Sequence, residues 1–243
     1  MTGSYISIQN GDKNFSAYLA IPEVGHGPGI VLCQEIFGIN AVMREKADFL
    51  AEEGYTVLVP DLFWRTEPGI ELGYNDEDFQ KAFTLYQNFN EDLGIEDIQA
   101  TLNTLKNLKE CDQDVGLSVV GYCLGGKLAY LAACRIPELV CAVGYYGVGI
   151  ENNLEEAKNI QGKLVLHMAE QDQFCPTSVR NQIIQTLSAY KNVQSYIYNN
   201  VDHAFARPHG MHYHKPSALI AHERTVTALR KQVGPDYDLE ALW

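Results

Sequence analysis

The segment Gly121-Tyr122-Cys123-Leu124-Gly125 constrains the fold more than any other part of the chain. The residues before it, 117–120, are mostly apolar or β-branched, and those after it, 126–135, are rich in Ala and Leu. We therefore expect the cysteine at a sharp turn from a strand into a helix, where glycines avoid a clash with the strained backbone. The positive end of the helix dipole would favour the thiolate and leave an N–H free to bind an oxyanion.

A Gly-x-nucleophile-x-Gly turn is the elbow of an α/β-hydrolase, with cysteine here in place of serine. The pentapeptide alone is weak evidence, because buried cysteines often serve as small apolar residues. The surrounding sequence adds to it, since strands and helices alternate as they do around a mostly parallel central sheet flanked by helices on both faces. We expect strands at 15–20 (an edge strand), 29–34, 56–61, 117–120, 141–146, 163–168 and 195–198, and helices at 42–53, 76–110 (capped by Asp76 or Asp78), 126–135, 178–189 and 217–233.

The 243 residues contain no Pro/Ser-rich linker and no repeat, which favours a single α/β-hydrolase domain over residues 1–243. The net charge of −13 argues against nucleic acid or an anionic membrane surface as a partner. No apolar run is long enough to predict a membrane span, and the first residues lack the pattern of a signal peptide. The six cysteines, several within apolar strands, predict free thiols and a cytoplasmic location rather than a disulfide framework.

Three reactive side chains occur in the order nucleophile, acid, histidine that α/β-hydrolases use. Cys123 comes first, Asp172 follows one predicted strand, and His203 follows the next. Because the carboxyl ends of parallel strands meet at one edge of a sheet, we expect the three to lie together. His203 would take the thiol proton, and Asp172 would orient the imidazole and stabilise its charged form.

Two backbone N–H groups are expected to bind the oxyanion. One belongs to Leu124, directly after the nucleophile, and the other to Ile36, in the loop that follows the strand at 29–34. Neither group can be recognised by its side chain, so this assignment depends on the expected fold.

Each of these assignments has a simpler alternative. Asp172 could be an ordinary turn residue, and Glu170 or Asp202 could be the acid instead. The histidines at 209, 212 and 214 are close in sequence and could mimic a metal site. No carboxylate or cysteine completes a ligand set beside them, so we predict neither a metal nor any other cofactor.

Five sequence blocks, in order, make the chain similar to the dienelactone hydrolases, also called carboxymethylenebutenolidases. They are Gln34-Glu35-Ile36-Phe37-Gly38, Pro60-Asp61-Leu62-Phe63, Gly121-Tyr122-Cys123-Leu124-Gly125-Gly126, Gly144-Tyr145-Tyr146-Gly147 and His203-Ala204-Phe205-Ala206-Arg207. The resemblance implies hydrolysis of the enol-lactone 4-carboxymethylenebut-2-en-4-olide to maleylacetate, without a cofactor. It also implies a Cys123, Asp172 and His203 triad. Glu35 would be a switch that holds the resting thiol and accepts its proton when substrate binds, and Arg207 would face a substrate carboxylate.

The chain departs from that pattern at the substrate pocket. Phe79 stands where bacterial members that open the chlorocatechol-pathway lactone carry a second arginine, and either Lys81 or Arg65 could compensate for the missing charge. The remaining residues expected on the pocket wall are Phe37, Phe83, Tyr86 and Tyr145.

These features predict a hydrolase that opens a lactone or a related activated carboxylic ester through a cysteine acyl-enzyme. Its partner would be a small, carboxylate-bearing substrate, and we expect a monomer or a weak homo-oligomer. One alternative is a carboxylesterase of broader specificity, favoured by Phe79 and Phe83. Another is a protein that only binds a small ligand or senses oxidants through Cys123.

Overall fold

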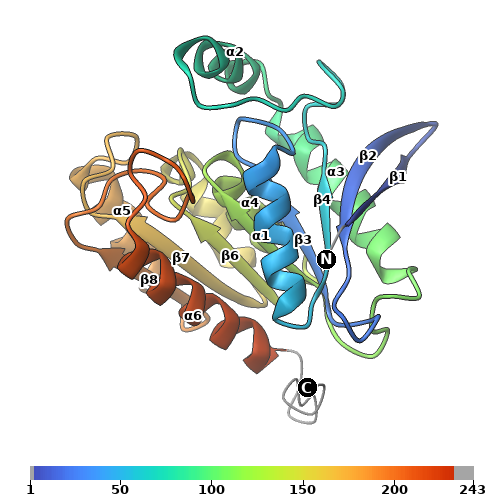
Figure 1. Ribbon diagram of the computed structural model, residues 1–243. Coiled ribbons are helices and arrows are strands. Elements are labelled where there is room, and N and C mark those ends of the chain that lie inside the picture. Colours follow the sequence, from blue (N-terminus) through green and yellow to red (C-terminus); the bar gives the residue numbers. More distant parts are fainter. Residues whose placement is uncertain (1–2, 233–243) are drawn as a thin grey trace.

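A central sheet of eight strands organises the molecule (Figure 1). The computed structural model describes residues 3–232. The strands are β1 (Ser4–Asn10), β2 (Lys13–Ala20), β3 (Gly29–Cys33), β4 (Thr56–Pro60), β5 (Ser118–Tyr122), β6 (Cys141–Tyr145), β7 (Lys163–Ala169) and β8 (Val193–Tyr198). The helices are α1 (Ala41–Glu52), α2 (Asp76–Gln87), α3 (Glu91–Lys106), α4 (Leu124–Arg135), α5 (Thr177–Leu187) and α6 (Lys215–Gln232), with a 3-10 helix, η1, at Ile150–Asn159.

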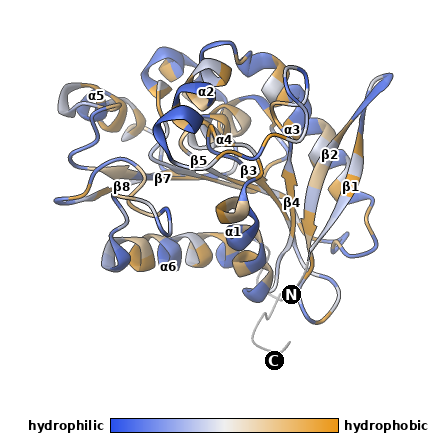
Figure 2. Ribbon diagram, turned by 45° about the horizontal axis from the view of Figure 1, so that its top comes forward, coloured by the Kyte–Doolittle hydropathy of each residue, from blue (hydrophilic) through white to orange (hydrophobic). Residues whose placement is uncertain are grey.

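The sheet is parallel over most of its width. Its strand order is β1-β2-β4-β3-β5-β6-β7-β8. The strands from β4 to β8 in this order run parallel to one another, whereas β2 pairs antiparallel with both β1 and β4. Helices α1 and α6 cover one face, while α3 and α4 cover the other (Figures 1 and 2). Strands β3 to β6 are buried along their whole length, as their continuous apolar sequences predict. The architecture is the expected α/β arrangement.

Three expectations about the elements are wrong. The segment 15–20 is not an edge strand, because β1 pairs with it in antiparallel register and forms the edge itself. The segment 76–110 is not one helix, because the chain breaks after α2 and restarts at α3. The expected cap at Asp76 or Asp78 is also wrong, because both residues lie in the first turn of α2. The side chains of Asn75 and Asn90 accept the N–H groups of Asp78 and Leu93 and so cap the two helices.

Helix α2 stands apart from the sheet at the top of Figure 1. Only Ala82 and Leu85 of its twelve residues are buried. The helix is therefore held by few contacts, and most of its surface is free to face solvent or a cavity. None of the described helices is both long enough and apolar enough to cross a membrane.

Candidate active site

The nucleophile candidate Cys123 lies between the last residue of β5 and the first residue of α4. Its backbone has φ 56° and ψ −114°, a left-handed conformation that residues other than glycine rarely adopt. The Cys123 N–H donates a 3.0 Å hydrogen bond to the carbonyl oxygen of Tyr145, which anchors the strained residue to the neighbouring strand. The N–H of Leu124, the first residue of α4, has no carbonyl partner within the helix and can bind a ligand.

The glycines around Cys123 make this turn possible. A Cβ atom on Gly121 would lie 1.9 Å from the carbonyl oxygen of Gly125, and one on Gly125 would lie 2.3 Å from that of Cys33. Both distances are far below van der Waals contact. The tight approach of α4 to β3 and β5 therefore requires glycine at both positions.

His203 and Asp172 form a buried pair beside the elbow. The Nδ1 of His203 lies 2.8 Å from Oδ2 of Asp172, and both side chains are almost fully buried. The other Asp172 oxygen accepts the N–H of Phe174, which fixes the carboxylate. The two alternative acids bind elsewhere: Glu170 accepts the N–H of Asn200, and Asp202 accepts the N–H of His203 rather than its ring.

The environment of His203 makes its imidazole a strong base. Burial alone lowers the pKa of His203, but the charge of Cys123, together with hydrogen bonds to Asp172 and Cys123, raises it to about 10. The ionised thiol and the Asp172 carboxylate both stabilise the protonated imidazole, which suits His203 as the acceptor of a proton from the cysteine.

Glu35 and Arg207 form a second buried pair. The Nε of Arg207 donates to Oε2 of Glu35 at 2.7 Å, and the Tyr146 hydroxyl donates to Oε1 at 3.4 Å. The carboxylate raises the pKa of Arg207 against the effect of burial. The sequence led us to expect that Glu35 holds the thiol and that Arg207 faces a substrate carboxylate, whereas in this state the two residues bind each other.

A cavity of about 570 Å³ opens over Cys123 and His203. Its walls are largely aromatic. Phe79 and Phe83, four residues apart on α2, stack with ring centroids 6.4 Å apart, and the Phe174 ring meets the edge of His203 at 4.9 Å. Of the expected oxyanion and pocket-wall residues, the following line the cavity: Ile36, Phe37, Phe79, Phe83, Tyr86 and Arg207.

Tyr145 is not on this wall, contrary to expectation. It is the last residue of β6 and is almost fully buried. Its ring stacks on Tyr122 at 4.4 Å, and its hydroxyl lies 2.6 Å from Oγ1 of Thr225. Its side chain therefore supports the elbow from beneath, on the side of α6.

The two cations considered as replacements for the charge missing at Phe79 form ion pairs elsewhere. Lys81 pairs with Glu67 at 2.6 Å on the surface. Arg65 pairs with the buried carboxylate of Asp97, which also accepts the indole N–H of Trp64. Neither of them lines the cavity over Cys123.

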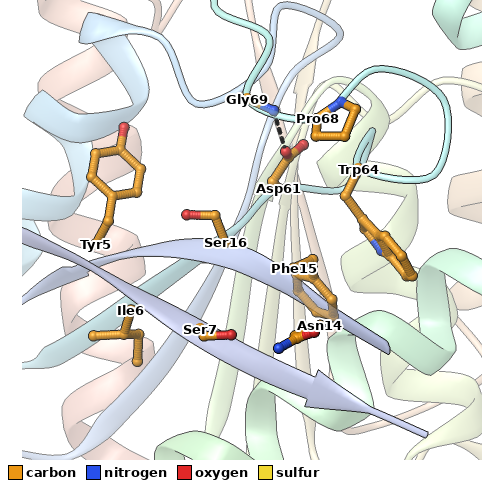
Figure 3. Close-up of a pocket in the computed structure, with 10 residues that line it drawn as sticks. All are labelled: Tyr5, Ile6, Ser7, Asn14, Phe15, Ser16, Asp61, Trp64, Pro68 and Gly69. Atoms are coloured by element: carbon orange, nitrogen blue, oxygen red, sulfur yellow. Dashed lines mark hydrogen bonds between the residues drawn. The ribbon is translucent and has the colours of Figure 1, made fainter. Parts of the chain in front are cut away.

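A further hollow beside Trp64 holds none of the expected catalytic residues. This pocket of about 440 Å³ lies against β1 and β2, where Asp61 accepts the N–H of Gly69 (Figure 3). Phe15 stacks on Trp64 at its floor, with ring centroids 5.4 Å apart. Its position beside β1 and β2 separates it from the nucleophile elbow.

The three clustered histidines turn to different partners. His209 faces Glu45 at 3.7 Å, His212 faces Asp202 at 3.6 Å, and His214 binds the Ser217 hydroxyl at 2.8 Å. Among the described residues no group of three or more His, Cys, Asp or Glu side chains is arranged to hold a metal ion. All six cysteines are free thiols.

The family model of the dienelactone hydrolase family matches residues 15–233. The chain belongs to the dienelactone hydrolase family. It is 38% identical over 226 residues to a carboxymethylenebutenolidase from Pseudomonas putida, covering 92% of this chain and 94% of that protein. It is 32% identical over 228 residues to carboxymethylenebutenolidase 1 from Cupriavidus pinatubonensis, covering 93% and 95%.

Solved structures share the fold of this family member. A dienelactone hydrolase-like promiscuous phosphotriesterase from metagenomic libraries superimposes with a TM-score of 0.80 at 19% identity, covering 96% of this chain and 99% of that one. The family and the α/β-hydrolase fold expected from the sequence are thereby confirmed.

Sequence reasoning missed three aromatic residues at the site of this family member. Tyr146 donates to Glu35 and packs against His203 at 5.0 Å, while Tyr74 and Phe174 line the cavity. Tyr146 has φ 38°, which turns it out of the sheet just beyond β6. The adjacent Tyr145 and Tyr146 could have pointed to this residue. Successive side chains of a strand point to opposite faces, so only one of the two tyrosines could reach the site.

Proposed function

We propose that this chain hydrolyses a lactone or activated carboxylic ester through a cysteine acyl-enzyme, with an enol-lactone as the first candidate substrate. The observation that supports this most is the buried Asp172–His203 pair beside Cys123 at the elbow, opening into a single cavity. The names of the curated relatives point to the same substrate class.

The first half of the reaction forms the acyl-enzyme. His203 takes the Sγ proton of Cys123, and the thiolate attacks the carbonyl carbon to form a C–S bond. The N–H groups of Leu124 and Ile36 bind the oxyanion. When the tetrahedral intermediate collapses, the C–O bond of the ring breaks, and the departing enolate oxygen takes up the proton from His203.

The second half releases the acid. His203 removes a proton from a water molecule, which attacks the thioester carbon. The C–S bond breaks, the proton returns to the cysteine sulfur, and the free carboxylic acid leaves. Asp172 keeps the same imidazole nitrogen facing the reaction throughout, because it holds Nδ1.

The Glu35–Arg207 pair fits a switch operated by a substrate carboxylate. Such a group would compete with Glu35 for the guanidinium, whose planar fork suits either carboxylate. The displaced Glu35 would then become an additional acceptor for the thiol proton. In this proposal the resting pair keeps Glu35 from accepting the thiol proton until an acidic substrate enters.

A carboxylesterase of broader specificity is the second candidate. The cavity walls carry six aromatic side chains, Phe37, Tyr74, Phe79, Phe83, Tyr86 and Phe174, and the arginine among them is already paired. Aromatic walls of this kind suit a flat, uncharged ester as well as an acidic lactone.

Steady-state kinetics with two esters tests the proposal. We expect turnover of dienelactone, of p-nitrophenyl acetate or of both, and a higher kcat/KM for dienelactone if the carboxylate matters. Cys123→Ala should abolish turnover, whereas Cys33→Ala should retain it, and mass spectrometry should find the acyl group on Cys123. Absence of turnover with every simple ester would favour a binding or oxidant-sensing protein instead.

A further inference from the structure

Lys46 of α1 connects two parts of the site that lie far apart in sequence. Its Nζ donates a 2.7 Å hydrogen bond to the carbonyl oxygen of Ala206, and it lies 3.9 Å from the centre of the Tyr122 ring. Ala206 directly precedes Arg207, and Tyr122 directly precedes Cys123. A single ammonium group therefore contacts the immediate neighbours of the nucleophile and of the arginine.

The loop that Lys46 contacts is strained. Ala204, directly after His203, has φ 62°, a left-handed conformation that costs a residue with a Cβ atom free energy. Its carbonyl oxygen accepts the N–H of Arg207, which closes a tight turn. A strained turn persists only where its surroundings hold it, and three side chains do so: Asp172 holds His203, Glu35 holds Arg207, and Lys46 holds Ala206.

A second cavity, of about 540 Å³, lies on the side of this loop where Lys46 is found. His209 lines both this cavity and the one over Cys123, so the loop forms a wall between them. The charged and titratable groups that interact with Lys46 are Glu35, Glu45, Tyr122, Arg207 and His222. Four further groups of this kind line the same cavity: Tyr145, His209, Tyr213 and Lys215.

We propose that Lys46 is a positioning residue, whose ammonium fastens the loop bearing His203 and Arg207 to the base of the nucleophile elbow. The inference rests on the proposed hydrolysis and adds a residue to it. The ammonium is a charge-assisted donor to the carbonyl and an attractive cation over the Tyr122 ring, and the neutral amine is a weaker donor and loses the ring interaction.

The charge of Lys46 gives this role a pH signature. Burial lowers the pKa of Lys46 to about 8, against the opposing effect of the Glu35 charge. The group is therefore charged at neutral pH and loses its proton as the pH rises through that value. The hydrogen bond from Lys46 to the carbonyl oxygen of Ala206 should weaken over the same pH interval.

The test compares pH profiles of kcat/KM between pH 6.5 and 9.5, using whichever ester the wild-type protein turns over. We expect the wild-type value to fall above a pH of about 8. Lys46→Met should lower kcat/KM at pH 7 by about tenfold, the effect of one charge-assisted hydrogen bond, and should show no further fall. Lys46→Arg should restore most of the activity and keep it up to pH 9.5, because arginine does not lose its charge.

Lys215→Met is the matched control, since Lys215 is exposed and lines the same cavity without holding the loop. It should reproduce the wild-type profile. A folded Lys46→Met protein with wild-type kinetics would overturn the inference. A Lys46→Met protein with a lower kcat/KM that still falls near pH 8 would overturn it as well. If Lys46→Met does not fold, the pH profile of Lys46→Arg tests the inference. A fall in kcat/KM near pH 8 as large as in the wild type would then overturn it. Absence of turnover by the wild-type protein would instead reject the proposed function.

Discussion

The Nε of Arg207 and Oε2 of Glu35 lie 2.7 Å apart, so that a largely buried guanidinium and a buried carboxylate neutralise one another at the wall of the cavity over Cys123. The two residues are 172 positions apart in sequence. Neither charge is well solvated, since the side chain of Glu35 is 1% exposed and that of Arg207 is 14% exposed. Removal of one partner should therefore be more costly than removal of both.

Glu35→Gln should lower the free energy of unfolding by about 3 kcal/mol, because it leaves the Arg207 charge buried without its partner. The double variant Glu35→Gln/Arg207→Gln should lose less than the sum of the two single losses. Urea denaturation of the four proteins measures this. Glu45→Gln, which removes a half-exposed carboxylate of α1, should change stability by less than about 0.5 kcal/mol. Strict additivity would show that the pair is not coupled.

Asp172→Asn should lower kcat by about 10⁴-fold with little change in KM, because an amide cannot hold the imidazole in the required tautomer or stabilise its charge. The substitution preserves size, so the fold should survive. Glu170→Gln is the matched control, since this neighbouring carboxylate binds a backbone N–H and not the imidazole. Comparable losses in both variants would mean that Asp172 is not the acid.

His167 should make the fold sensitive to acid. It is fully buried between the Tyr198 and Thr225 hydroxyls, and burial lowers its pKa to about 3. The unfolded chain binds this proton near pH 6.5, so the stabilisation is present above pH 6.5 and is lost as the pH falls toward 3.

Between pH 7 and pH 5, His167 should therefore account for a loss of about 2 kcal/mol in the free energy of unfolding. Denaturation of the wild type and of His167→Gln at both pH values isolates this contribution. The variant should be less stable than the wild type at pH 7, but its free energy of unfolding should change less between pH 7 and pH 5. An equal change in the two proteins would contradict the assignment.

Phe79→Arg should favour carboxylate-bearing substrates. Phe79 is 39% exposed and lines the cavity, so a guanidinium there can reach a ligand at little cost to packing. We expect kcat/KM for dienelactone to rise by about tenfold relative to that for p-nitrophenyl acetate. Phe79→Leu serves as the control for loss of the ring. A parallel change for both esters in the arginine variant would argue against a carboxylate site at this position.

The elbow and the order of the reactive residues were predictable because they depend on local sequence. Glycines at 121 and 125 permit one kind of turn, and parallel strands that end shortly before Asp172 and His203 bring those side chains to the same edge. Contacts between distant segments could not be predicted in this way. The pairing of Glu35 with Arg207 depends on how two loops meet, and the ion pair between Arg65 and Asp97 depends on how the loop after β4 meets α3.

The errors in the predicted elements have a similar origin. The strand at 15–20 looks like an edge strand until β1, whose sequence alternates only weakly, is seen to pair with it. The choice of Tyr145 over Tyr146 failed because strand periodicity does not reveal where a strand ends. The backbone of Tyr146 turns at that point, with φ 38°, and carries the second ring to the site.

Helix α2 supplies three aromatic side chains to the cavity yet buries only two of its own residues. Substitutions on it can therefore reshape the substrate pocket while hardly disturbing the packed interior. The proposed catalytic residues, by contrast, lie in loops that follow strands β3, β5, β7 and β8, and the turn at Cys123 requires glycine on both sides. A protein built in this way can acquire a new preferred ester by exchanging a few side chains on one helix, and its chemistry stays intact while it does so.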